Sequence, residues 1–159
     1  MKHTISVIVE NKPGVLHRVA GLFGRRSFNI ESLAVGTTEK PEISRMTIVT
    51  EGDEQDLEQI KKQLYKIIPV LKVYDIPPEE ALERELILIK VKAEVKDQNE
   101  ITKVAEITGA KIAHVGENSM LLEISAETEK AEELEKLLKK FGIIELVRTG
   151  KIALQKEGV

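Results

Sequence analysis

Apolar and polar residues alternate along the first ten positions, and this alternation predicts a β-strand with one buried face. Its inward-facing residues are Ile5, Val7 and Val9. After a turn at residues 11–14, apolar residues recur every three or four positions, which predicts an amphipathic helix that begins near Gly14. The apolar face of this helix consists of Val15, Leu16, Val19, Leu22 and Phe23. The opening stretch therefore predicts a strand, a turn and a helix that share one core.

The same two periodicities continue up to residue 75. Strands are predicted at residues 27–37, 44–51 and 70–75. Between the last two strands, a helical stripe runs to Pro69, which ends it. Its apolar residues are Leu57, Ile60, Leu64 and Ile67. The order βαββαβ is that of a ferredoxin-like unit, in which two helices cover one face of a four-stranded sheet.

The pattern then repeats after a polar, proline-marked junction. The second half predicts a strand at 86–95, a helix capped by Asn99, and a hairpin with strands at 110–115 and 119–125. A further helix and two strands, at 143–147 and 151–154, follow. We therefore predict an α+β protein of two tandem ferredoxin-like βαββαβ domains. The first domain is expected at residues 1–76, the linker at 77–83 and the second domain at 84–159. Each unit has a sheet face or edge that needs covering, so we expect a homodimer or a higher homo-oligomer.

Composition excludes several classes of partner and chemistry. The chain of 159 residues has no cysteine, which removes disulfides, thiolate metal sites and cysteine nucleophiles together. The formal net charge is only -3 and the two signs are interspersed, so nucleic acid is not an expected partner. No apolar run reaches the roughly 20 residues of a membrane span, and the N-terminus shows no signal-peptide pattern. We expect a cytoplasmic protein that does not contact membranes.

Catalytic and metal-binding patterns are also missing from the sequence. His3, His17 and His114 lie far apart without metal-ligand spacing, so no metal site is expected. No motif for nucleophilic or phosphate chemistry occurs, and we expect no catalytic residues in this chain. Arg25 and Arg26 could bind an anion, but two arginines at a helix end also suit the helix dipole, which is the interpretation we favour.

The turn before the first helix is the strongest candidate for a ligand site. Pro13 fixes one backbone angle, and Gly14 has no Cβ to block an approaching ligand. The first helical turn leaves backbone N–H groups without intrahelical partners, and the helix dipole adds positive charge there. A carboxylate would bind well at such a position. The alternative is that Pro13 and Gly14 only turn the chain.

Three blocks of sequence resemble one known family. NKPGVLHRVAGLFGRRSFNIESLAV, SRMTIVTEGDEQDLEQIKKQL and VLKVYD are similar, in order and spacing, to the regulatory small subunit of acetolactate synthase, also called acetohydroxyacid synthase. The resemblance is strong over the first 75 residues, and ERELILIKV and IIELVRTGKIAL extend it more loosely to the second half. The PGVL turn alone would indicate only the broader class of ACT domains.

The resemblance implies a non-catalytic regulatory subunit whose first domain is an ACT domain. Such a subunit activates a separate catalytic large subunit and allows valine, or another branched-chain amino acid, to inhibit it. Thiamine diphosphate, Mg and FAD are then expected on the catalytic subunit, and no cofactor is expected in this chain. The family places the effector between the turn after the first strand of one protomer and the second-strand start of its dimer partner. Carried over, the effector-binding residues are Asn11, Pro13, Gly14, Val15 and Leu16, facing Asn29 and Ile30.

One residue departs from the family pattern, and two other functions stay open. The family usually has glycine where this chain has Ser27, so effector affinity or preference is expected to differ. The first alternative is a stand-alone amino-acid sensor of the ACT class that acts on another partner. The second is an acylphosphatase-like hydrolase on the same scaffold, with Arg18 or Arg25 holding phosphate.

Overall fold

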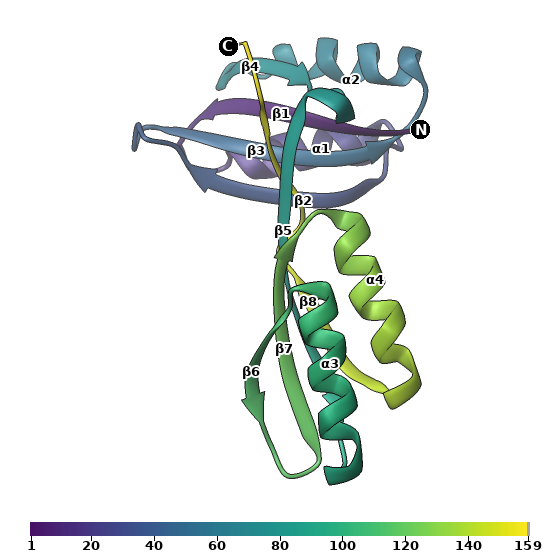
Figure 1. The fold of residues 1–159 in the computed structure, drawn as a ribbon. Helices are drawn as coiled ribbons and strands as arrows, with labels where there is room; N and C mark the ends of the chain where they lie inside the picture. The colour runs from purple at the N-terminus through teal and green to yellow at the C-terminus, as the bar shows by residue number, and fades with distance from the viewer. Residues whose placement is uncertain (159) are drawn as a thin grey trace. The chain divides into compact units, whose positions relative to one another are not determined.

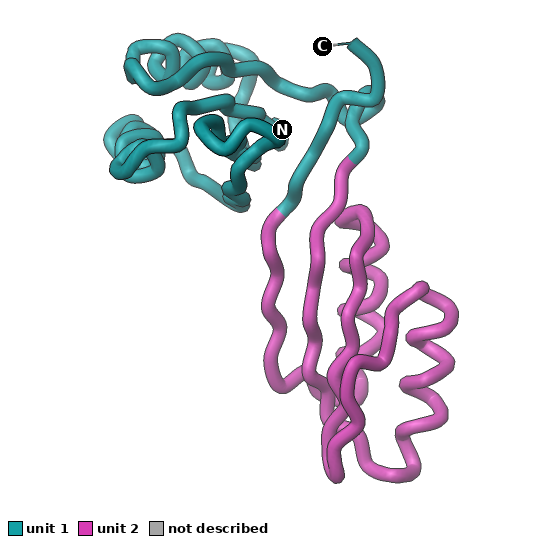
Figure 2. Tube along the Cα trace, turned by 90° about the vertical axis from the view of Figure 1, so that its left-hand side faces the viewer, with its two compact units in different colours: residues 1–82, 151–159 teal, residues 83–150 magenta. Residues whose placement is uncertain are grey.

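The computed structural model describes residues 1–158. The chain divides into two compact units (Figure 2). Unit 1 consists of residues 1–82 together with the C-terminal residues from Lys151 onwards, and unit 2 consists of Glu83–Gly150. Each unit has its own buried apolar cluster, so each is described by itself.

Unit 1 contains a four-stranded antiparallel sheet in the order β2-β3-β1-β4, with two helices (Figure 1). Along the central strands, every second side chain packs against the helices in the core, and the others lie on the opposite face of the sheet. This is the alternation that the sequence predicted. The helix α2 begins with a reciprocal capping box between Asp53 and Asp56, which satisfies two N–H groups of its first turn. The elements are β1 (Lys2–Glu10), α1 (Val15–Arg25), β2 (Ile30–Thr37), β3 (Ile43–Glu51), α2 (Glu54–Tyr65) and β4 (Val70–Asp75), followed by the 3-10 turn η1 (Pro78–Glu80).

The second face of the unit 1 sheet buries polar side chains. Thr4, Ser6 and Thr47 are all nearly inaccessible to solvent. Arg45 reaches across this face, and its Nη1 donates to Ser6 Oγ at 2.8 Å and to the Tyr74 hydroxyl at 2.6 Å. Burial raises the pKa of Tyr74, but the hydrogen bonds with Ser6 and Arg45 outweigh it, so the pKa lies below its usual value. The polar face is thus held by an internal hydrogen-bond network.

The C-terminal segment packs on unit 1. Ala153, in β9 (Ile152–Gln155), is buried with Ile76 and Ala81, and Tyr74 packs against this cluster. The main-chain N–H of Lys151 donates to Ser32 Oγ of β2 at 3.0 Å. These contacts explain why residues from Lys151 onwards group with unit 1, whereas the sequence-based division placed the whole of 84–159 in the second domain.

Unit 2 repeats the architecture with helices covering one face of an antiparallel sheet ordered β6-β7-β5-β8, and β9 also pairs with β5 (Figure 1). Core residues alternate along β5 with residues of the other sheet face, and Ile87, Ile89 and Val91 are fully buried. Leu86 and Leu88, which point to the other face, are each 40% exposed. The elements are β5 (Ala81–Lys92), η2 (Val95–Asp97), α3 (Gln98–Thr108), β6 (Lys111–Val115), β7 (Ser119–Ala126), α4 (Thr128–Leu138), η3 (Lys139–Phe141) and β8 (Ile143–Arg148).

The predicted fold class of two βαββαβ units is confirmed, and the differences lie at element ends. The second strand begins at Ile30 and not at residue 27, because Ser27 adopts a left-handed conformation that a strand cannot contain. The prediction that Asn99 caps a helix was wrong: α3 begins at Gln98, and Asp97 precedes it. Within residues 1–158, no helix is long and apolar enough to cross a membrane.

Candidate ligand-binding site

The turn between β1 and α1 has an open conformation that depends on Gly14. Gly14 is the N-cap of α1 and has φ 84°, a left-handed conformation that residues with a Cβ adopt only at a cost. A Cβ built at this position would meet no atom within 4 Å. The space in front of the turn is therefore free, and a side chain added at Gly14 would project into it.

The first turn of α1 presents main-chain donors to that space. The N–H of Val15 donates weakly to Lys12 O at 3.4 Å, and that of Arg18 makes the first regular helical bond, to Gly14 O at 3.1 Å. Among the described residues, the N–H groups of Leu16 and His17 have no main-chain acceptor. The first turn contains no acidic residue that could occupy this position. Together with the helix dipole, these donors can hold a carboxylate.

Apolar and amide side chains surround the turn. Val15 is buried at 4% exposure and anchors the helix to the core, whereas Leu16 is 44% exposed beside the turn. Asn11 is fixed twice: its N–H donates to Glu42 O at 2.8 Å and its Nδ2 donates to Pro41 O at 3.0 Å. The main-chain N–H and one of the two side-chain N–H groups of Asn11 are thereby engaged, and its Oδ1 remains an acceptor that an ammonium group can use.

The other predicted half of the site, Asn29 and Ile30, follows the end of α1. That end is a Schellman motif: the N–H of Phe28 donates to Phe23 O at 2.9 Å, and the N–H of Ser27 donates to Gly24 O at 3.2 Å. Ser27 occupies the position where this motif favours glycine, with φ 58°. Thr50 Oγ1 then fixes the chain by donating to the main-chain oxygen of Asn29 at 2.8 Å, which leaves the exposed Asn29 side chain free of that bond.

Within one chain the two halves of the predicted site do not meet. The strand register places Glu10, at the end of β1, opposite Ile43 at the start of β3, whereas Ile30 lies opposite Thr50. Ile43 and Thr50 are seven residues apart along β3, which corresponds to about 24 Å at the usual rise of a strand. The structure thus brings Asn11, Pro13, Gly14, Val15 and Leu16 together at one end of the sheet and puts Asn29 and Ile30 at the other.

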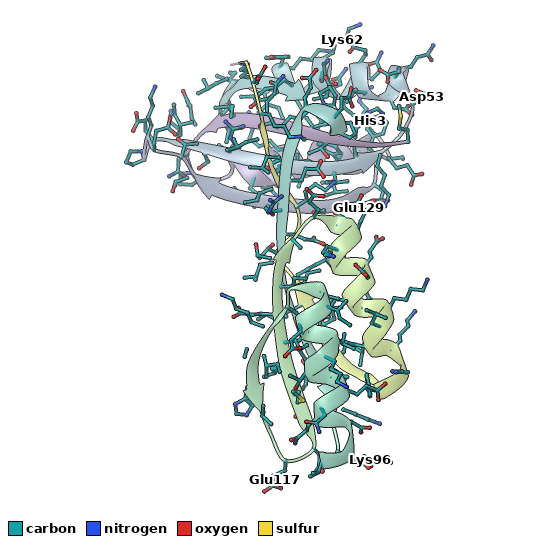
Figure 3. All side chains as sticks on the ribbon, viewed as in Figure 1. His3, Asp53, Lys62, Lys96, Glu117 and Glu129 are labelled. Carbon is teal, nitrogen blue, oxygen red and sulfur yellow. The ribbon has the colours of Figure 1, made fainter. Side chains whose placement is uncertain are left out.

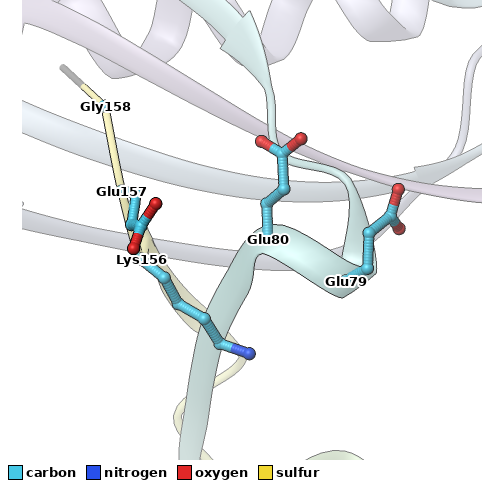
Figure 4. Close-up of a pocket in the computed structure, with 5 residues that line it drawn as sticks. All are labelled: Glu79, Glu80, Lys156, Glu157 and Gly158. Carbon is cyan, nitrogen blue, oxygen red and sulfur yellow. The ribbon is translucent and has the colours of Figure 1, made fainter.

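A second hollow, of about 470 Å³, lies between η1 and the C-terminal segment (Figure 4). Sequence reasoning did not single it out, because its walls are brought together only by the packing of β9 on unit 1. Glu79, Glu80 and Glu157 line it, but their carboxylates point in different directions, and Gln155 Nε2 donates to one oxygen of Glu80 at 2.7 Å. Over residues 1–158, no group of three His, Asp or Glu side chains is placed to hold a metal ion.

The three histidines lie in separate places. His3 Nε2 lies 3.1 Å from Gly52 O, at the end of β3. His17 is exposed in the first turn of α1, and His114 is exposed on β6 of unit 2. These positions give them local contacts rather than a shared site.

Comparison with known proteins gives matches over both halves of the chain. The family described as an "AHAS small subunit-like ACT domain" matches residues 5–72, and the family described as "Small subunit of acetolactate synthase" matches residues 84–157. A probable acetolactate synthase small subunit from Archaeoglobus fulgidus is 52% identical over 154 residues, which cover 97% of this chain and 96% of that protein. The acetolactate synthase small subunit of Mycobacterium leprae is 46% identical over 154 residues, covering 97% and 91%.

A solved structure agrees with these sequence matches. The crystal structure of the acetolactate synthase small subunit from Thermotoga maritima is similar to this chain with a TM-score of 0.92 and 42% sequence identity. The match covers 100% of this chain and 99% of that one. Fold and sequence therefore point to the same family.

Proposed function

The chain belongs to the family of acetolactate synthase small subunits, and from this premise we propose that it activates a separate catalytic large subunit and makes that subunit sensitive to inhibition by valine. In this role the chain carries no catalytic residue. The thiamine diphosphate, Mg²⁺ and FAD that acetolactate formation requires are bound by the large subunit. The regulatory chain contributes binding energy that differs between active and inhibited states of the complex.

The effector site in this proposal is the open turn at Gly14. The valine carboxylate accepts hydrogen bonds from the N–H groups of the first turn of α1. Amide oxygens of Asn11 and Asn29 accept from the ammonium group, and the apolar side chains of Val15, Leu16 and Ile30 contact the isopropyl group. The observation that supports this assignment most directly is that Gly14 is left-handed with free space in front of it and unpaired N–H groups behind it.

The separation of the two halves supports a site that two copies of the chain complete. β2 is an edge strand of the unit 1 sheet, so one side of its backbone is available for pairing. Thr37, at the end of β2, lies opposite Ser44, at the same end of the sheet as Gly14. Antiparallel pairing of two β2 strands about a two-fold axis would bring the partner's Ile30 to that end. A homodimer of this kind presents the turn of one copy to the β2 start of the other, twice.

The test is the rate of acetolactate formation by the cognate large subunit alone, with this protein, and with this protein plus valine. We expect a higher rate on addition of the protein and a loss of that rate when valine is added. If the synthase rate does not change but valine raises the thermal midpoint of this chain, the protein is instead a stand-alone amino-acid sensor. If neither effect occurs, the proposed function is wrong.

A further inference from the structure

A groove of about 370 Å³ runs between α1 and the end of α2 in unit 1. Its floor is apolar: Leu22 is 6% exposed, and Ile67 packs against the core of the unit. Its rim is cationic or polar, and none of the residues that line it is acidic. The lining residues that carry the argument are His17, Arg18, Leu22, Arg25, Lys66 and Ile67.

Within residues 1–158, no ion pair neutralises the cations of this rim. In the part of the chain that the structure describes, Arg18, Arg25 and Lys66 take part in no ion pair. By contrast, Lys61 of α2 pairs with both Glu58 and Asp75. The helix α1 contains no acidic residue. Three positive charges gathered in a protein whose formal net charge is -3 repel one another, and an anion that enters the groove relieves that repulsion.

The position of Arg25 supports this use of the groove. A Cβ at Gly21 would lie 3.2 Å from Arg25 Nη1, so the Arg25 side chain lies back along α1 at the level of Gly21. Its guanidinium is therefore directed one turn towards the N-terminus of α1, away from the last carbonyl groups of that helix. This is the usual direction of a long side chain on a helix, and it lets Arg25 line the groove.

We propose that the groove between α1 and α2 docks an acidic segment of the catalytic large subunit, with an apolar side chain of that segment on Leu22 and Ile67. The inference rests on the proposed function and adds the contact surface to it. Cations around an apolar floor match a peptide that carries both carboxylates and an apolar residue, whereas a small inorganic anion would use the cations alone.

The groove adjoins the proposed effector site through one helix. His17, at one end of the groove, follows Leu16 of the effector turn in the first turn of α1. A ligand at the turn and a partner in the groove therefore contact the same rigid element. If effector binding shifts α1, it changes the affinity of the groove for the large subunit. By linkage, binding of the large subunit then changes the affinity of the turn for the effector by the same factor.

The experiment measures the affinity of the full-length chain for the large subunit, by titrating the activation of acetolactate formation, for wild type, Lys66→Glu and Lys62→Glu. Both substitutions change the charge by two and both lie at the end of α2, but Lys62 does not line the groove and projects from the outer side of the helix (Figure 3). We expect Lys66→Glu to weaken binding about tenfold and Lys62→Glu to change it less than about twofold. Lys66→Gln should show a smaller loss in the same direction, and raising the salt concentration should narrow the difference between wild type and Lys66→Glu.

The outcomes separate the groove from the wider function. If the wild-type chain itself does not activate the large subunit, the proposed function fails. If it does and the two Glu variants bind equally well, the groove is not the docking surface. A second measurement is the shift of the thermal midpoint of each chain on addition of inorganic tripolyphosphate. If Lys66→Glu abolishes this shift but keeps the wild-type affinity for the large subunit, the groove binds a small anion and the proposal is overturned.

Discussion

The two units build the same strand-to-helix turn in opposite ways. In unit 1 the turn between β1 and α1 places Gly14 before the helix and leaves N–H groups of the first turn without partners. In unit 2 the turn between β5 and α3 is closed by the 3-10 turn η2, where the N–H of Asp97 donates to the main-chain oxygen of Glu94 at 2.9 Å. Asp97 Oδ2 accepts from the N–H of Glu94 at 3.1 Å. At the same point of the fold, unit 1 thus leaves main-chain N–H groups of the helix start without main-chain acceptors, whereas in unit 2 a carboxylate of the turn itself accepts a main-chain hydrogen bond.

The helix ends show the reverse distribution of glycine. In unit 2, Gly109 ends α3 with φ 80°, and the N–H of Ala110 donates to Ala105 O at 2.9 Å. In unit 1 the equivalent position after α1 is Ser27, with φ 58°. Because a left-handed residue with a Cβ costs about 1 kcal/mol, the end of α1 is the more strained of the two. The two units therefore differ in local capping although they share a topology.

The largest effect is expected at Gly14. Gly14→Asp places a side chain and a negative charge in front of the open turn, so we expect valine affinity to fall by at least about a hundredfold while activation of the large subunit is largely retained. Gly14→Asn is the matched control, because Asn has the same shape and also tolerates a left-handed conformation. Isothermal calorimetry and valine inhibition curves measure both. If Gly14→Asp keeps the wild-type valine sensitivity, the site is not at this turn.

A smaller loss is expected at Asn29. Asn29→Ala removes the amide oxygen that is proposed to accept from the ammonium group of valine, and we expect the valine dissociation constant to rise about tenfold. The fold should not change, because the hydrogen bond from Thr50 uses the main-chain oxygen of Asn29. Calorimetry of the full chain gives the affinity, and the thermal midpoint serves as the control. An unchanged affinity would remove Asn29 from the site.

The two left-handed helix ends should respond in opposite directions. Gly109→Ala meets no atom within 4 Å, so it adds only backbone strain and should destabilise the chain by about 1 kcal/mol. Ser27→Gly relieves the strain but increases the entropy of the unfolded chain, so a net stabilisation of about 0.5 kcal/mol is expected. Urea denaturation of the two variants measures both. A loss of stability in Ser27→Gly would show that the serine is not strained.

The smallest effect is expected at the closed turn of unit 2. Asp97→Ala removes the acceptor of the Glu94 N–H and should lower stability by about 0.5 kcal/mol. Valine affinity should stay within about twofold of the wild-type value, because the proposed effector site lies in unit 1. The same calorimetric titration tests it, and a large change in affinity would mean that unit 2 contributes to the effector site.

Local sequence patterns predicted much of the fold and singled out the turn at Gly14 as a candidate site. The alternation around Ile5 and the helical spacing after Gly14 each gave an element close to its observed position, because both periodicities depend only on which face is buried. The predicted cap at Asn99 was wrong because Asp97, two residues earlier, also suits the start of a helix. Which of two such neighbouring residues starts the helix depends on tertiary contacts. The separation of Gly14 and Ile30 could not be predicted, because it follows from the strand register, which no local sequence pattern contains.

Two further features required tertiary packing. The return of Ala153 to the core of unit 1 depends on contacts with Ile76 and Ala81, which are more than seventy residues away in sequence. The groove exists only because α1 packs beside α2, which brings Arg18 and Lys66 to one hollow. Such sites are assembled from segments whose individual sequences show only ordinary charged helix faces.

The most direct test of the proposed effector site, shared between two copies of the chain, is complementation between two altered chains. A mixed dimer of one Gly14→Asp chain and one Asn29→Ala chain, purified with two different tags, contains one site with both alterations and one site with neither. We predict that calorimetry finds one valine bound per mixed dimer with wild-type affinity, although each altered chain alone has lost that affinity. If the mixed dimer binds valine no better than the two altered homodimers, the site lies within single chains and the account is wrong.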